Sequence, residues 1–257
     1  MQKEIQSKLS SLNLKKIRYF DSIGSTNDEA LAWAAQGAPD LSLILADEQT
    51  SGRGRAGRKW VSPRGTSLAL SLILRPTAHE ADSPSLFTGL AALALVDALK
   101  QHRLSAQIKW PNDILINRKK CAGILVESVW TGDALDAVVL GIGVNVLAGS
   151  VPPTDGLLFP ATSLEGEAGH PLDRSDFLRD VLAAILKWRP LIGQQKFIQA
   201  WESALAFKGE AVRVWQDNET PLEGSVMGLA PDGNLRLLVN DKIVTVHFGE
   251  IHLRPTL

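Results

Sequence analysis

A short stretch rich in arginine and glycine carries the residues best suited to chemistry. The segment "DEQTSGRGRAGRKW", residues 47–60, places Arg53, Arg55 and Arg58 among three glycines. Glycine lets the backbone turn tightly and lie close to a bound molecule. Guanidinium groups grip carboxylate and phosphate oxygens in a bidentate way. The segment therefore predicts a loop that binds an anionic ligand, and a solvated surface loop is the alternative that it leaves open by itself.

Composition narrows the choice of partner. The chain has 27 Lys plus Arg against 28 Asp plus Glu, a formal net charge of −1. This balance gives no electrostatic reason to wrap nucleic acid. No apolar run is long enough for a membrane span, and the start "MQKEIQSKLS" lacks the apolar centre of a signal peptide. We therefore expect a globular protein of the cytoplasm with no membrane partner.

Cysteine and histidine predict neither a disulfide nor a metal cluster. The single cysteine, Cys121, lies in "KKCAGILVES" with no base nearby in the sequence, so we expect a buried, unreactive thiol. One cysteine excludes an intramolecular disulfide and fits a reducing compartment. The five histidines show no metal-ligand spacing.

Two stretches approach known nucleotide-binding motifs without matching them. "GRGRAGRKW" has the glycine spacing of a P-loop, but Arg58 replaces the lysine and Lys59 replaces the hydroxyl residue. "GIGVNV" begins like a dinucleotide fingerprint, but Val146 stands where the third glycine belongs and no helix follows. Both readings fail, so nucleotide binding would need another kind of site.

The elements that must position the arginine–glycine segment alternate between helices and strands. Helical patterns cover residues 25–37, 83–102, 173–192 and 194–206, and strand patterns cover 41–47, 66–74, 106–116, 119–130 and 135–146. Ser25 or Thr26 is expected to cap the first of these helices. Polar turns between the later strands favour antiparallel hairpins. We predict an α+β fold in which helices flank a mixed sheet.

Two further regions follow. Residues 147–161 contain three prolines and two glycines without a period, which predicts a long irregular loop. From Gly209 onward, short strands separated by turns predict a small all-β module resembling an SH3-like barrel. The expected domains are therefore 1–208 and 209–257.

Five blocks taken together resemble the biotin protein ligases. They are "GSTNDEA" at 24–30, the arginine–glycine segment, "KWPNDILI" at 109–116, "KKCAGILVE" at 119–127 and "GIGVNV" at 141–146, in the family's order and spacing. The resemblance implies a catalytic sheet like that of class II aminoacyl-tRNA synthetases, followed by the small barrel, whose end is similar to "GEIHLR" here. It also implies that biotin is activated by ATP to biotinyl-5′-AMP, with Mg²⁺, and then joined to a lysine of a biotin carboxyl carrier protein of acetyl-CoA carboxylase or a related carboxylase.

The resemblance assigns roles residue by residue. The biotin-binding set that it implies is Ser25, Thr26, Asn27, Gln49, Gly52, Arg53, Gly54, Arg55, Lys120 and Gly123. The ATP-binding set is Arg53, Arg55, Arg58, Trp60, Asn112, Lys120 and Asn145. Lys120 and Arg55 are the expected catalytic residues, and Asp113 is a candidate Mg²⁺ ligand. Gly123, Gly141 and Gly143 lie in strand patterns, where a missing side chain is expected to make room for a ligand.

Alternative functions make different sequence demands. A lipoate or octanoate ligase shares the fold but is not expected to carry the arginine–glycine segment or the "KWPND" block. A biotin-operated repressor needs a winged helix before the catalytic core, whereas "GSTN" begins at residue 24, so specific DNA binding is not expected. A non-catalytic biotin-binding module conflicts with the intact basic loop and Lys120. Homodimer formation stays open.

Overall fold

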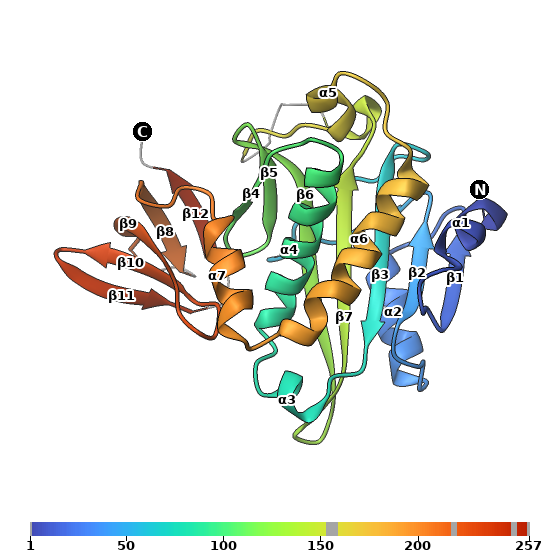
Figure 1. Cartoon of the computed structure of the whole chain (residues 1–257), viewed down its shortest axis with the longest axis horizontal. Helices are drawn as coiled ribbons and strands as arrows, with labels where there is room; N and C mark the ends of the chain where they lie inside the picture. Colours follow the sequence, from blue (N-terminus) through green and yellow to red (C-terminus); the bar gives the residue numbers. More distant parts are fainter. Residues whose placement is uncertain (1, 153–158, 217–219, 248–250, 256–257) are drawn as a thin grey trace.

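A computed structural model shows two β-sheets built from successive parts of the chain (Figure 1). It describes residues 2–152, 159–216, 220–247 and 251–255. The larger sheet has the order β1-β2-β3-β7-β6-β5-β4. Its strands are β1 (Lys16–Phe20), β2 (Ser42–Ala46), β3 (Ser67–Leu74), β4 (Ala106–Lys109), β5 (Asp113–Ile116), β6 (Lys119–Thr131) and β7 (Ala134–Asn145). The β1–β2 pair is parallel and the other pairs are antiparallel, so the predicted mixed sheet is confirmed.

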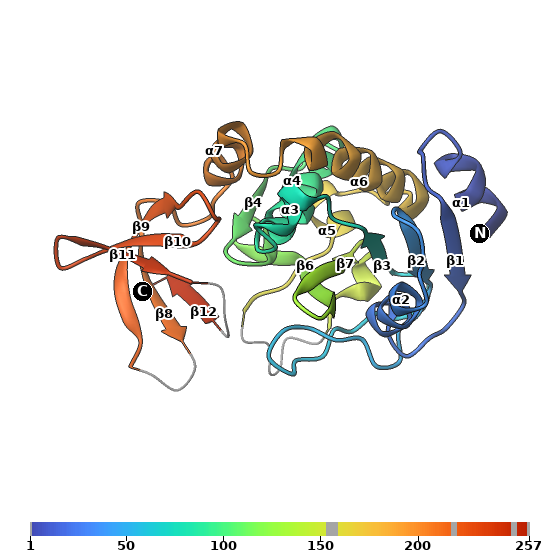
Figure 2. The same ribbon diagram turned by 90° about the horizontal axis from the view of Figure 1, so that it is seen from below.

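Helices cover both faces of the larger sheet (Figure 2). They are α1 (Gln2–Leu9), α2 (Thr26–Ala35), α3 (Ala78–Ala81), α4 (Leu86–Gln101), α5 (Leu164–Ala168), α6 (Arg174–Trp188) and α7 (Gln195–Ser203), with short 3₁₀ turns at Ala148–Ser150 and Arg189–Leu191. Helices α4 and α6 lie side by side on one face, and α2 lies on the other. None of the helices in the described part of the chain is long and apolar enough to span a bilayer.

Alternation along the strands builds the two cores. On β3, Leu70 and Leu72 join the large cluster beneath α4 and α6, whereas Ile73 joins the smaller cluster with Trp33 of α2. This follows from the period of two in a strand, which sends successive side chains to opposite faces. Ser71 therefore points to the α2 face between apolar neighbours that serve the other core.

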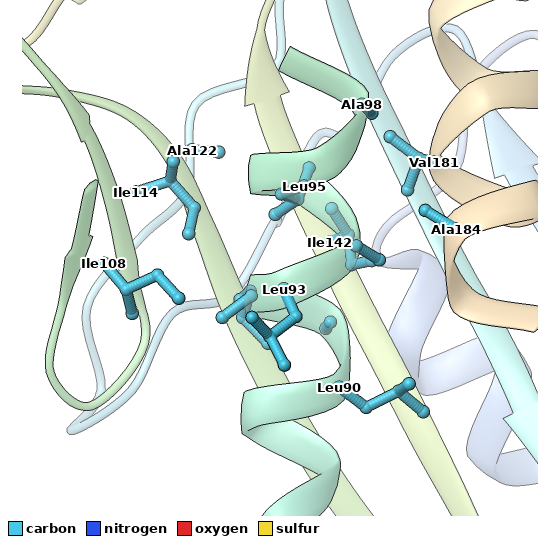
Figure 3. Packing of buried hydrophobic residues seen from close by; sticks show 14 of the residues in the cluster. Leu90, Leu93, Leu95, Ala98, Ile108, Ile114, Ala122, Ile142, Val181 and Ala184 are labelled. Carbon is cyan, nitrogen blue, oxygen red and sulfur yellow. The ribbon is translucent and has the colours of Figure 1, made fainter. Parts of the chain in front are cut away.

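The α4 face is a dry, closely packed layer. Figure 3 shows Leu90, Leu93 and Leu95 of α4 against the sheet, near Ile114 and Ile142. All five side chains are at most 3% exposed. Helix α4 is apolar almost all round because the sheet, α6 and α7 enclose it. This core holds β5, β6 and β7 in place, which leaves their opposite face free to carry a site.

Two segments differ from the sequence expectation. Residues 106–116 do not form one strand, because β4 and β5 pair antiparallel on either side of the cis peptide Trp110–Pro111. Proline has no N–H and interrupts a ladder. The predicted capping of α2 is also wrong: Ser25 is its N-cap residue but makes no side-chain cap bond, and Thr26 bonds to Gln49 instead.

The last part of the chain forms a five-stranded antiparallel sheet of order β11-β10-β9-β8-β12. Its strands are β8 (Ala211–Gln216), β9 (Leu222–Leu229), β10 (Leu235–Val239), β11 (Lys242–Val246) and β12 (Ile251–Pro255). The sheet fits an SH3-like module, but the expected closure into a barrel is wrong for the described residues. The β10–β11 hairpin projects away from the rest (Figure 1), with Ile243 53% exposed, so β11 does not curl back to β12.

Candidate functional site

A cavity of about 400 Å³ opens on the α2 face of the larger sheet. Its walls come from the start of α2, the arginine–glycine segment, the β4–β5 turn and strands β5, β6 and β7. The predicted residues that line it are Ser25, Thr26, Asn27, Gln49, Arg53, Gly54, Arg55, Arg58, Trp60, Asn112, Asp113, Lys120, Gly123 and Asn145. Gly52 is buried beside the cavity without lining it. Segments more than a hundred residues apart thus meet at one place.

Glycines in the sheet create the floor of this cavity. A Cβ on Gly141 would lie 2.2 Å from Asn27 Oδ1, and one on Gly143 would lie 2.4 Å from the Trp60 ring. A Cβ on Gly123 would lie 3.0 Å from the same ring. We expected these glycines to make room for a ligand. In the structure all three glycines line the cavity, and their missing side chains also let Asn27 and Trp60 lie directly on the strands.

One end of the cavity is a compact set of uncharged polar groups. Gln49 Oε1 accepts hydrogen bonds from Thr26 N at 2.9 Å and from Thr26 Oγ1 at 3.0 Å. Ser71 Oγ lies 2.8 Å from Thr26 Oγ1 and 2.6 Å from Asn27 Oδ1. Buried Ser25 lines the same end. Hydroxyls and amides of this kind match a small ligand with both N–H donors and a carbonyl acceptor.

Asn27 is held more firmly than its place in the sequence suggested. Its Nδ2 donates to Leu125 O at 3.1 Å and to Glu127 Oε2 at 2.8 Å. Both amide hydrogens are therefore used by β6, and only the carbonyl oxygen faces the polar end. Neither Ser71 nor Glu127 was among the predicted site residues. The one signal for each is a polar residue inside an apolar strand.

The arginine–glycine segment is a small hairpin over the cavity. Gly54 N donates to Arg58 O at 2.7 Å, and Trp60 N donates to Gly52 O at 2.8 Å. Gly57 turns the tip with a φ of 68°. A Cβ on Gly52 would lie 2.4 Å from the Trp60 carbonyl oxygen, so this close return requires glycine. We call residues 52–60 the arginine hairpin.

The arginines of this hairpin point to different partners. Arg53 donates from both terminal nitrogens to Glu127, at 2.9 Å and 2.6 Å, and lies 2.8 Å from Asp28. Arg55 Nη1 lies 3.5 Å from Asn112 Oδ1, at the cavity wall. Arg58 lines the wall too. The two arginines nearer the tip thus lie toward the cavity.

A pair of lysines in the cavity wall shares one buried carboxylate. Lys120 Nζ lies 2.6 Å from Asp113 Oδ1, and Lys109 Nζ lies 3.1 Å from Asp113 Oδ2. Burial alone would raise the pKa of Asp113, but the two ammonium groups outweigh burial and lower that pKa to about 2. Asp113 is therefore ionised at neutral pH and holds Lys120 by a charge-assisted hydrogen bond.

The start of β6, which carries Lys120, pairs with β5 on one side and bonds to residues 160–162 on the other. Lys120 N donates to Pro160 O at 2.7 Å, and Thr162 N donates to Lys120 O at 2.9 Å. Asn145 Nδ2 donates to Thr162 O at 3.1 Å, so this predicted residue supports the same segment. Asn112 Nδ2 donates to Ile124 O at 2.8 Å, which leaves its oxygen for Arg55. The expected loop 147–161 contributes Pro152 and Phe159 to the cavity, and its residues 153–158 lie outside the described part.

The described residues do not build a protein cage for a metal ion. They contain no group of three His, Cys, Asp or Glu side chains suited to metal binding. Among the described residues that line the cavity, Asp113 is the one carboxylate, and both of its oxygens face ammonium groups. Cys121 is buried, and burial raises the pKa of its thiol, as expected for an unreactive side chain.

Comparison with known proteins finds relatives of this chain along most of its length. Residues 19–145 match the family described as the Biotin/lipoate A/B protein ligase family. The bifunctional ligase/repressor BirA of Bacillus subtilis is 37% identical over 239 residues, which are 91% of this chain and 73% of that relative. The biotin–[acetyl-CoA-carboxylase] ligase of Paracoccus denitrificans is 41% identical over 200 residues, covering 73% of this chain and 80% of the relative.

A solved structure extends the likeness to the whole fold. The biotin protein ligase from Aquifex aeolicus in complex with biotin and ATP superimposes with a TM-score of 0.82 at 28% identity, covering 95% of this chain and 100% of that one. The similarity includes both sheets, since nearly the whole of each chain is matched. The chain therefore belongs to the biotin/lipoate A/B protein ligase family and, within it, to the biotin protein ligases.

Proposed function

We propose that this cavity activates biotin with ATP to biotinyl-5′-AMP and then passes the biotinyl group to a lysine of a biotin carboxyl carrier protein. One observation carries the proposal. Lys120, held by buried Asp113, lines the same cavity as Arg55 and Arg58, and the uncharged polar groups Ser25, Thr26 and Gln49 line it too. This is a site with a place for a polar ring at one end and for anions at the other. The relatives at 34–41% identity that are named biotin–[acetyl-CoA-carboxylase] ligase support it.

In the first step, an oxygen of the biotin carboxylate attacks the α-phosphorus of ATP. The new P–O bond forms as the bond to pyrophosphate breaks, so negative charge is brought together and then spread over phosphate oxygens. Fixed cations are the main requirement of such a reaction, and no protein nucleophile is needed. We assign Lys120 to the carboxylate and α-phosphate oxygens, and Arg55 and Arg58 to the phosphates.

In the second step, the amine of the carrier lysine attacks the acyl carbon of biotinyl-5′-AMP. The amide bond forms, AMP leaves with the bonding electrons, and the amine loses a proton. Between the two steps the mixed anhydride must be kept from water. The arginine hairpin stands over the cavity where it can do this.

We assign the uncharged polar end to the ureido ring of biotin. Ser25, Thr26 and Gln49 supply hydroxyl and amide groups there, and the carbonyl oxygen of Asn27 faces the same end. Trp60, seated over Gly123 and Gly143, is assigned to the wall between biotin and the nucleotide. Gly54 lines the cavity as part of the hairpin backbone.

Mg²⁺ is proposed to enter with ATP, since it prefers phosphate and water oxygens to a full set of protein ligands. When bound, it neutralises charge on the phosphates. We no longer assign Asp113 to the metal, because its two oxygens hold Lys120 and Lys109. We assign Asp113 to the fixing of Lys120.

The partners and organisation complete the proposal. We propose cytoplasmic action on a carboxyl carrier, domains at 1–208 and 209–257, and no specific DNA binding, since the net charge is −1. Gel filtration with and without biotin and ATP tests whether the chain forms a homodimer. Duplex DNA should bind weakly and without sequence preference at physiological salt.

The decisive experiment is the transfer itself. The protein is incubated with ATP, Mg²⁺, biotin and a biotin carboxyl carrier domain, and the intact mass of the carrier is measured. We expect one added biotinyl group that requires both ATP and Mg²⁺. Lipoate and octanoate replace biotin in parallel reactions. An unchanged carrier mass beside an active control ligase, or a lipoyl product in its place, would overturn the proposal.

A further inference from the structure

We propose that Glu127 of β6 is a positioning residue that holds the arginine hairpin in its closed position by pairing with Arg53. In this proposal Arg53 binds Glu127 and does not bind ligand phosphates. We call the Glu127–Arg53 pair the latch. The inference rests on the proposed function and deepens it. It concerns how the hairpin is held and how its closure is coupled to the biotin end of the cavity.

The Arg53 guanidinium is already paired with two carboxylates. Nη1 and Nη2 donate to Oε1 and Oε2 of Glu127 at 2.9 Å and 2.6 Å, the parallel pairing that fixes both planes. Asp28 adds a second carboxylate 2.8 Å from Nη2. Two carboxylates beside one guanidinium repel a phosphate. Arg53 is therefore poorly placed for ATP, although its side chain borders the cavity.

Arg53 lies at the base of the arginine hairpin. Arg53 and Lys59 pair across the base of the hairpin, and Gly54 N donates to Arg58 O. Arg53 joins the base of this hairpin to β6 through its ion pair with Glu127. Fixing the base fixes the direction of the tip, which carries Arg55 and Arg58. Glu127 thus acts on the phosphate end through Arg53.

Glu127 also contacts Asn27 at the uncharged polar end of the cavity. Its Oε2 also accepts from Asn27 Nδ2 at 2.8 Å, and Asn27 is 4% exposed at the uncharged polar end. One carboxylate therefore touches both the residue that borders the ring site and the arginine that anchors the hairpin. Orientation of Asn27 and closure of the hairpin depend on the same group. This coupling predicts that loss of Glu127 disturbs both.

The test compares Glu127→Gln, Arg53→Gln, the double variant and a matched control. Glu48→Gln is the control, because Glu48 also pairs with an arginine, Arg64, at 3.3 Å, close to the hairpin in sequence but outside the cavity lining. Each protein forms biotinyl-5′-AMP in place, and release of the labelled intermediate is followed after dilution into unlabelled biotinyl-5′-AMP. Thermal unfolding confirms that each variant is folded.

We expect the intermediate to leave Glu127→Gln and Arg53→Gln about tenfold faster than wild type, the effect of roughly one charge-assisted pair. The double variant should be no worse than either single variant, since both remove the same latch. Amide exchange across residues 51–60 should rise in the liganded variants. The KM for biotin should rise in Glu127→Gln and stay near wild type in Arg53→Gln, because Asn27 is hydrogen-bonded to Glu127 and not to Arg53.

Three outcomes would overturn the latch. In the first, Glu127→Gln behaves like Glu48→Gln while Arg53→Gln loses ATP affinity, which makes Arg53 a phosphate ligand. In the second, the two single variants have additive effects on release. In the third, both release the intermediate at the wild-type rate. Failure of the proposed function is distinguishable, because wild-type protein would then form no biotinyl-5′-AMP at all.

Discussion

The two cationic regions of the cavity are held in opposite ways. Lys120 stands at the start of β6, where it pairs with β5 on one side and its backbone bonds to residues 160–162 on the other. Its ammonium is fixed by a carboxylate that is 7% exposed. Arg55 and Arg58 stand on a hairpin whose residues are mostly exposed or half-buried. Both regions present positive charge to the same space.

The difference indicates a division of labour. A charge that must meet one pair of reacting oxygens benefits from a rigid mount, because rigidity avoids reorganisation during reaction. A charge that covers a finished intermediate must also let substrate in and product out. The glycines of the hairpin give the open state high backbone entropy, and its arginines repel one another until an anion arrives. We infer that the lysine side acts in chemistry and the hairpin acts in retention.

The largest effect is expected from Lys120→Ala. Removing this ammonium should lower adenylate synthesis on the order of a hundredfold or more, since the charge acts mainly on the transition state. Pyrophosphate release without carrier is the measurement. Lys119→Ala is the matched control, because its neighbouring Nζ contacts Glu167 at 3.0 Å, away from the cavity lining. Wild-type rates in Lys120→Ala would remove Lys120 from the chemistry and erase the contrast between the two regions.

The next effect concerns the hairpin. Arg55→Gly should release biotinyl-5′-AMP about tenfold faster, while adenylate synthesis falls by less than in Lys120→Ala. Release of preformed intermediate and pyrophosphate formation are measured on the same protein. Arg64→Gly, an exposed arginine four residues after the hairpin, serves as the control. If Arg55→Gly impairs retention of the intermediate and pyrophosphate formation equally, the hairpin and the sheet do not have separate functions.

Trp60 connects the two regions, and Gly143 tests that connection. The Trp60 ring lies over Gly143 and 5.4 Å from Lys120 Nζ. Gly143→Ala places a methyl group 2.4 Å from the ring, so the ring must move and the fold should lose about 2 kcal/mol of stability. The KM values for biotin and ATP should rise together. Chemical unfolding and steady-state kinetics are the measurements.

Gly24→Ala is the matched control for that experiment, because a Cβ at Gly24 would meet nothing within 4 Å. It lies beside the polar end of the cavity, yet should leave unfolding and both KM values near wild type. If Gly143→Ala also leaves them unchanged, Trp60 does not link the sheet to the hairpin.

The sequence predicted the architecture well where the signal is local. The alternating strand 66–74, the turns between later strands and the "GRGRAGRKW" block each define their own element, and the structure has these elements at those places. The resemblance then gathered blocks that no periodicity could have joined. Pro111 shows the limit of prediction from local sequence. Because proline has no N–H, residues 106–116 form two strands, although the Ile and Leu residues in this segment suggest one continuous strand.

Ser71 and Glu127 show why the rest of the site could not be predicted. Each is one polar residue in a strand, and its meaning lies in a partner 44 or 100 positions away along the chain. Register and the tilt of α2 decide those pairings, and neither is written in local composition. The same holds for Gly143, which lines the cavity and whose missing side chain admits an indole from the hairpin.

The smallest expected effect is a pH dependence of the unfolding free energy, which tests whether Asp113 holds Lys120 and Lys109 as a charged group. Asp113 has a folded-state pKa lowered to about 2, so its ionised form stabilises the fold. That contribution is complete above the unfolded pKa of about 4 and is lost as the pH falls toward 2. Asp113→Asn lacks it at every pH. The difference in unfolding free energy between wild type and Asp113→Asn should therefore shrink by about 1 kcal/mol between pH 6 and pH 3.

Urea unfolding at several pH values across this range measures that difference. Asp133→Asn, an exposed carboxylate in the β6–β7 turn, should give a difference from wild type that stays flat over the same range. The difference in unfolding free energy between wild type and Asp113→Asn must become smaller as the pH falls. Protonation of Asp113 removes from wild type the same ion pairs that the substitution removes at every pH. A constant difference would mean that Lys109 and Lys120 do not hold Asp113 as a charged group. Lys120 would then lack the charged support that distinguishes it from the arginines of the hairpin, and the proposed division of labour would lose its main structural basis.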